Sequence, residues 1–164
     1  MTIITIILIA LLPVGLMGNF VLQNIDSGNQ KVEFNLPEFN LENDGEYTRI
    51  RTQNSGYTTY PGYPKLPVYT MVYHVNPFTE YEFTLDVISS HWESNIRISP
   101  AQIGIRNLDE KEASEGTYST DSVDPYPQNN LWISDRQNMR GEEFITISVT
   151  PFTYYPASNE LEIL

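Results

Sequence analysis

Cysteine is absent from this chain of 164 residues. An exported protein of this size without cysteine has no disulfide framework, so its stability must come from a hydrophobic core. The absence also excludes a cysteine nucleophile, a thiolate metal site and thiol redox chemistry within the chain. Histidine is scarce too, and His74 and His91 alone do not make the ligand set of a zinc site. We therefore expect neither a metal nor a cofactor.

Basic residues are few. The chain has 9 lysines and arginines against 21 acidic residues, a formal net charge of −12. No basic patch is available to meet phosphates, which excludes nucleic acid as a partner. Anionic membrane surfaces would also repel the chain. The composition predicts an acidic, soluble domain.

Long apolar runs are restricted to the N-terminus. Residues 3–17 carry no charge, and the first charged side chain is Asp26. The run is too short and too early for a membrane span but suits the h-region of a secretory signal, and Gly18 is small enough for a cleavage site. We predict a signal peptide over residues 1–18, a secreted mature chain from Asn19, and no membrane contact after processing. An uncleaved anchor or a buried helix remains the alternative.

Helical periodicity is lacking after the signal, and alternation replaces it. Apolar and polar residues alternate over residues 31–36, 81–87, 145–149 and 160–163, and residues 68–73 are apolar on both faces. Period two is typical of strands with one buried face, and an apolar run is typical of a central strand. With 11 prolines and 9 glycines between such segments, residues 19–164 are predicted to form an all-β, antiparallel β-sandwich of jelly-roll type.

One long stretch, residues 107–128, has little to bury. A loop of that length in a compact domain is either disordered or functional. Carboxylates gather in it: Asp109, Glu110, Glu112, Glu115, Asp121 and Asp124. Calcium takes such hard oxygen ligands, but the spacing matches no known calcium loop, and a solvated surface loop is the simpler interpretation.

The side chains suggest two further functions. Ser89 or Ser90, His91 and Asp86 are sequence neighbours, whereas a catalytic triad needs side chains that converge from separate elements, so we expect no enzyme. Aromatic side chains are abundant, and an exposed platform of them could stack on sugar rings. The alternative function is therefore a stand-alone secreted module that binds carbohydrate or a surface. The aromatics are Tyr57, Tyr60, Tyr63, Tyr69, Tyr73, Trp92, Trp132, Tyr154 and Tyr155.

Three stretches occur in an order that carries a resemblance. They are residues 62–67 (GYPKLP) before a strand, residues 100–107 (PAQIGIRN), and residues 126–127 (YP) followed by Arg140-Gly141 and residues 151–156 (PFTYYP). Together, over residues 30–164, they resemble the propeptides of the gingipain family of secreted cysteine peptidases. Each stretch also has a local structural explanation. Prolines hold the chain extended where it enters a strand, and glycine permits a tight turn at Gly141.

The resemblance implies a β-sandwich propeptide that sits against a cysteine peptidase catalytic domain, assists its folding and blocks its cleft. The catalytic domain would lie in the same precursor or be encoded nearby; because the last residues, 160–164, look like a strand, we expect the chain to stop short of it. By the same resemblance Arg106 enters the specificity pocket of the peptidase, with Asn107 and Lys111 as neighbouring contacts.

Overall fold

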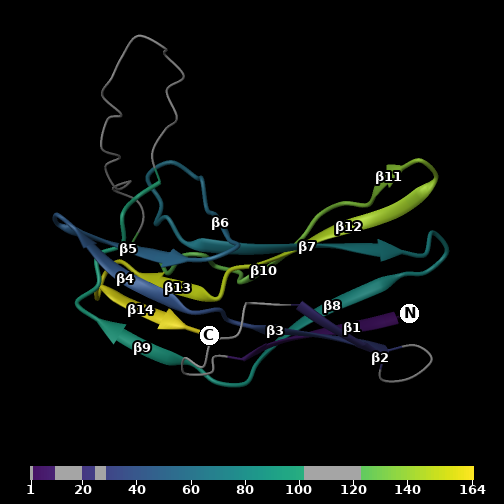
Figure 1. Cartoon of the computed structure of the whole chain (residues 1–164), viewed down its shortest axis with the longest axis horizontal. Coiled ribbons are helices and arrows are strands. Elements are labelled where there is room, and N and C mark those ends of the chain that lie inside the picture. Colours follow the sequence, from purple (N-terminus) through teal and green to yellow (C-terminus); the bar gives the residue numbers. More distant parts are fainter. Residues whose placement is uncertain (1, 10–19, 25–28, 102–122) are drawn as a thin grey trace, which may run out of the picture.

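The chain folds into strands throughout the part that the computed structural model describes, residues 2–9, 20–24, 29–101 and 123–164 (Figure 1). No helix in those residues is long and apolar enough to cross a membrane. The strands are β1 (Thr2–Ile9), β2 (Phe20–Asn24), β3 (Asn29–Asn35), β4 (Phe39–Asp44), β5 (Tyr47–Thr52), β6 (Gly56–Tyr57), β7 (Pro67–Val75), β8 (Tyr81–Val87), β9 (His91–Ser94), β10 (Leu131–Ile133), β11 (Gln137–Met139), β12 (Glu142–Val149), β13 (Phe152–Tyr155) and β14 (Glu160–Ile163).

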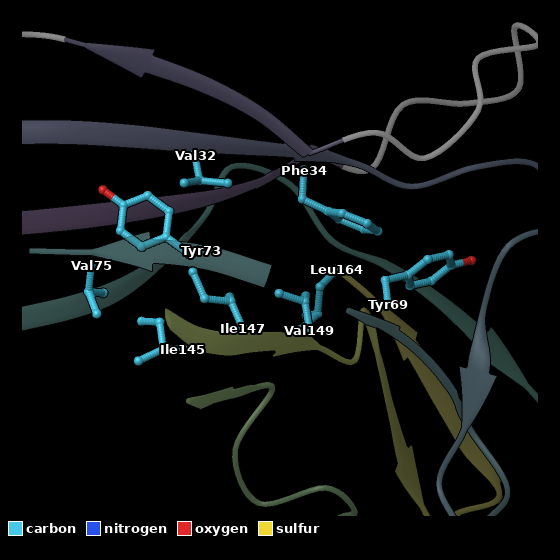
Figure 2. Close-up of a cluster of buried hydrophobic side chains, with 9 residues drawn as sticks. All are labelled: Val32, Phe34, Tyr69, Tyr73, Val75, Ile145, Ile147, Val149 and Leu164. Carbon is cyan, nitrogen blue, oxygen red and sulfur yellow. The ribbon is translucent and has the colours of Figure 1, made fainter. Parts of the chain in front are cut away.

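Two sheets form the larger half of the fold. One has the order β2-β3-β1-β8, and the other has the order β10-β12-β7-β6 with β11 also paired to β12. Their facing side chains make the main core, in which Phe34 of β3 lies 4.9 Å from the ring of Tyr69 of β7. Figure 2 shows this cluster, whose buried members are Val32, Phe34, Tyr69, Tyr73, Val75, Ile145, Ile147, Val149 and Leu164. The all-β sandwich prediction is thus confirmed.

A second core lies between the β4–β5 hairpin and the sheet β13-β14-β9. Its buried side chains are Ile50, Leu66, Ile98, Phe152, Tyr154, Leu161 and Ile163. Phe39 of β4 meets Phe152 of β13 edge to face, with ring centroids 5.3 Å apart. Aromatic pairs of this geometry add to the free energy gained from area burial. The two cores thus stabilise opposite ends of the same elongated fold.

The alternation in the sequence corresponds to the buried faces of several strands. Ile145, Ile147 and Val149 of β12 are buried, as period two requires. β7 lies between β12 and β6, in the central position expected of it. Its outer face is nevertheless exposed, because Val72 keeps 58% of its surface in solvent. The central position of residues 68–73 therefore does not bring burial of both faces.

The N-terminal apolar run contributes a strand. β1 lies between β3 and β8 and runs parallel to both, so this sheet is mixed and not purely antiparallel. The matched register extends from Ile3 to Ile9 against β3 and from Thr2 to Leu8 against β8. The pairing of β1 does not test cleavage after Gly18, so the export signal over residues 1–18 stays a prediction.

Candidate functional site

The three residues predicted to contact a peptidase, Arg106, Asn107 and Lys111, fall within residues 102–122 and so lie outside the described residues. The structure does describe the chain on either side of that segment. We call residues 99–101 and 124–126 the stem, because they lead into and out of residues 102–122.

The entering arm of the stem is anchored to the main body by backbone hydrogen bonds. Ile98, which has no exposed surface, fixes its start in the second core. The Lys65 amide then donates to the carbonyl of Ser99 at 2.8 Å, and the Ala101 amide donates to the carbonyl of Tyr63 at 2.8 Å. Ala101 is itself buried. The chain is therefore fixed up to the last residue before the segment.

The leaving arm is anchored to β13. The amide of Tyr126 donates to the carbonyl of Tyr154 at 2.9 Å, and the amide of Tyr154 donates back to the carbonyl of Tyr126 at 2.8 Å. Tyr154 is buried, and its hydroxyl donates to Oδ1 of Asn159 at 3.1 Å. This pair of bonds ties the leaving arm to the best-buried strand of the second core.

Both arms meet at Tyr63. Its backbone carbonyl holds Ala101, and its ring lies 5.0 Å from the ring of Tyr126. The ring of Tyr60 packs edge-on against the ring of Tyr63, with centroids 5.1 Å apart, and Tyr60 is 66% exposed. The two ends of residues 102–122 are thus brought together around one residue. Such an arrangement gives the intervening segment a rigid base. Binding loops are commonly positioned by a rigid scaffold in this way.

The stem is held in a largely apolar setting. Burial raises the pKa of the Tyr126 hydroxyl, and a hydrogen bond with Thr58 partly offsets that effect. Thr58 is itself fixed, since its Oγ1 donates to the carbonyl of Pro64 at 2.7 Å and accepts the amide of Leu66 at 2.9 Å. At physiological pH the Tyr126 hydroxyl is therefore neutral and hydrogen-bonded at the place where the two arms of the stem meet.

Sequence reasoning missed this tyrosine cluster, although a local signal for it exists. Each of its three rings precedes a proline, as Tyr60-Pro61, Tyr63-Pro64 and Tyr126-Pro127. A residue before proline is pushed toward extended backbone, which favours packing of side chains across neighbouring segments. Their convergence still depends on contacts between segments that are far apart in sequence.

The aromatic side chains of the described residues do not form one sugar-binding platform. Tyr69, Tyr73 and Tyr154 are buried in the cores. Among the exposed rings, Trp132 lies on β10, whereas Trp92 of β9 packs at 5.0 Å on Tyr155 in a different sheet. The exposed aromatics are thus divided between sheets and the stem, and their geometry does not favour the carbohydrate-binding alternative.

The two histidines are exposed and paired with glutamates. Nδ1 of His74 lies 3.6 Å from Oε2 of Glu142, and Nε2 of His91 lies 3.0 Å from Oε1 of Glu93. No group of three or more potential metal-ligating side chains is found where the structure describes the chain. Both histidines are therefore surface side chains paired with a glutamate.

Comparisons with known proteins agree with this picture. The family Propeptide_C25 matches residues 19–164. Two solved structures from Porphyromonas gingivalis share the fold. The complex of RgpB pro- and mature domains matches with a TM-score of 0.56 and 15% identity, over 77% of this chain and 68% of that chain. A structure on the zymogenic latency of gingipain K matches with a TM-score of 0.68 and 14% identity, over 89% and 87%.

A comparison with curated protein sequences gives no match. The family match alone covers most of the chain, and it begins at the residue where the mature chain was predicted to begin. This chain therefore belongs to the Propeptide_C25 family, the propeptides of gingipain-type peptidases.

Proposed function

We propose that this chain is the exported propeptide of a gingipain-type cysteine peptidase, which it helps to fold and holds latent by occupying the active-site cleft. The family match over residues 19–164 carries the proposal. The fold is shared with a pro-domain solved together with its mature domain, and with a structure that concerns zymogenic latency. The partner is accordingly the peptidase domain of the same precursor.

The segment 102–122 is the part of the chain that enters the cleft. Its stem is fixed at Ala101 and Tyr126 around Tyr63, so binding does not have to order the base of the loop. Arg106 supplies the substrate-like contact, because a guanidinium pairs with a pocket carboxylate through two hydrogen bonds. Asn107 and Lys111 add contacts at the rim of the cleft.

The chain contributes restraint and no catalysis. It contains no cysteine, and its two histidines are paired with surface glutamates. Residues 1–18 direct it to the cell exterior, where peptidases of this type act. The acidic charge of the chain, −12, keeps it soluble once it is separated from the enzyme.

The test is an inhibition constant measured in trans against a gingipain-type peptidase for the wild-type chain, Arg106→Ala, Lys111→Ala and Arg140→Ala. Arg140 is the matched control, since it is an exposed arginine in the turn between β11 and β12. We expect Arg106→Ala to weaken inhibition by roughly tens- to thousands-fold, because it leaves a buried pocket carboxylate unpaired.

The other variants give the discriminating outcomes. Arg140→Ala should inhibit like the wild type. A selective loss at Lys111→Ala would assign the pocket to lysine in place of arginine. Equal constants for all four chains would remove Arg106 from the mechanism, and a wild-type chain that does not inhibit would overturn the proposal.

A further inference from the structure

β1 occupies a position that two other strands define. β3 and β8 do not pair with each other; each pairs with β1 along the sheet order β2-β3-β1-β8. The register is continuous on both sides, so that Ile6 stands opposite Val32 of β3 and Leu85 of β8. Neighbouring strands lie about 4.8 Å apart, which puts β3 and β8 roughly 10 Å from each other, too far to share hydrogen bonds.

The opposite sheet holds β3 and β8 in these places. On β3, Val32 and Phe34 are completely buried in the main core. The start of β8 is tied down by Arg136, which donates to the backbone carbonyls of Pro77 and Thr79 and lies over the ring of Tyr81. The ring contact of Phe34 with Tyr69 of β7 and the contacts of Arg136 come from elements other than β1, so the rest of the domain also helps to hold β3 and the start of β8 in place.

The composition of β1 fits the gap between β3 and β8. Every residue of Thr2–Ile9 except Leu8 is β-branched, and such residues favour strands. Parallel strands with neighbours on both sides read as continuous apolar runs. The same run also suits the h-region of an export signal, and the Propeptide_C25 match starts at residue 19, after β1 has ended.

We propose that β3 and β8 form a strand-binding site, that its ligand before processing is the N-terminal segment Thr2–Ile9, and that removal of the export signal vacates it. The ligand class is an extended, apolar, β-branched peptide that runs parallel to both strands. Once vacated, the site exposes the unpaired amides and carbonyls of two facing strand edges, which require new partners. The proposal concerns residues remote from the stem, so it stands or fails separately from inhibition of a peptidase.

The absence of cysteine allows a direct test in the chain of residues 1–164, because two introduced thiols are the only ones in those residues. Thr5 is in register with Thr84, whereas Glu82 is in register with Ile3, two residues away. Both Thr84 and Glu82 are exposed. The Cα atoms of a registered pair are about 5 Å apart, within disulfide range, and those of the offset pair about 8 Å, beyond it.

We expect Thr5→Cys/Thr84→Cys to form its disulfide at least tenfold faster under mild oxidation than Thr5→Cys/Glu82→Cys. Equal rates would overturn the proposal.

A second measurement asks whether the segment is held as a ligand. A site-specific protease sequence placed within residues 10–18 of the chain of residues 1–164 allows the folded protein to be cut, with hydrogen exchange followed before and after. Retention of the leader fragment, or its release with loss of amide protection in β3 and β8, supports the site. Release with unchanged protection would show that the two strands do not depend on it and would contradict the proposal.

Discussion

Tyr69 links the main core to β5 through its hydroxyl. Its ring is in the main core with only 3% of the residue exposed, and its hydroxyl shares a hydrogen bond of 2.7 Å with Oγ1 of Thr52 on β5. Burial raises the pKa of Tyr69 to about 12, although the bond to Thr52 acts in the opposite direction. Because this phenol is buried, the unfolding free energy changes with pH in the alkaline range.

The direction in which the unfolding free energy changes with pH follows from proton linkage. The folded pKa lies above the unfolded value near 10, so the neutral phenol stabilises the fold below pH ~10 and that contribution is lost as the pH rises through the folded pKa. Between about pH 10 and 12 we expect the wild type to lose on the order of 2–3 kcal/mol more unfolding free energy than Tyr69→Phe. Urea unfolding at stepped pH measures this, with Tyr60→Phe as the exposed control; parallel curves for the wild type and Tyr69→Phe would refute the assignment.

Asn130, which directly precedes β10, is a second single-residue anchor, because its side chain binds the connection from β12 to β13. Its Nδ2 donates to the carbonyl of Thr150 at 2.8 Å and to Oγ1 of Thr153 at 3.0 Å. Asn130→Ala should lower the unfolding free energy by about 1–3 kcal/mol, since it leaves partly buried acceptors unpaired. Asn129→Ala, at the exposed neighbour, should change it little. A thermal or urea melt in which the two variants behave alike would contradict this role.

Among the elements, the β11–β12 hairpin shows how a two-residue turn sets a register. Arg140 and Gly141 have φ values of 56° and 87°, the left-handed pair of a type I′ turn. The turn was predicted from Arg140-Gly141, and the observed strands end at Met139 and begin at Glu142. A Cβ at Gly141 would meet nothing within 4 Å, so the glycine is needed for its backbone and not for space.

Substitutions in this turn should therefore act through φ alone. Gly141→Ala is expected to destabilise the fold by about 1–2 kcal/mol, the cost of a left-handed alanine. Arg140→Asn should leave stability unchanged or raise it slightly, because Asn-Gly is the preferred pair for this turn. Urea midpoints compare the two, and a Gly141→Ala chain as stable as the wild type would show that the turn does not restrain the hairpin.

For the whole molecule, much of the sandwich could be predicted from local pattern. Alternation reports the buried face of a strand because successive side chains point to opposite sides, and it located β3, β8, β12 and β14. The exposure of Val72 could not be read in this way, since it depends on whether another element covers the sheet. Nor could the role of residues 2–9, because one apolar run serves equally as an export signal and as a paired strand.

The convergence of the two arms of the stem could not be predicted from the sequence for a related reason. Its arms converge on Tyr63 from residues 99–101 and 124–126, and the leaving arm is anchored on β13. No local pattern encodes contacts over such separations. The function was predicted from the resemblance of three ordered stretches to the gingipain propeptides, and the family match confirms that resemblance. The inhibitory residues Arg106, Asn107 and Lys111 stay predictions.

The central claim, that the chain restrains a peptidase at its active site, is tested most directly by the reactivity of the peptidase's catalytic cysteine. Because the chain itself has no cysteine, a thiol-alkylating reagent labels only the enzyme in a mixture of the two. We predict that the alkylation rate falls in proportion to the fraction of enzyme bound, and that Arg106→Ala requires a higher concentration for the same protection. A complex that forms while the cysteine reacts at its free rate would contradict the account.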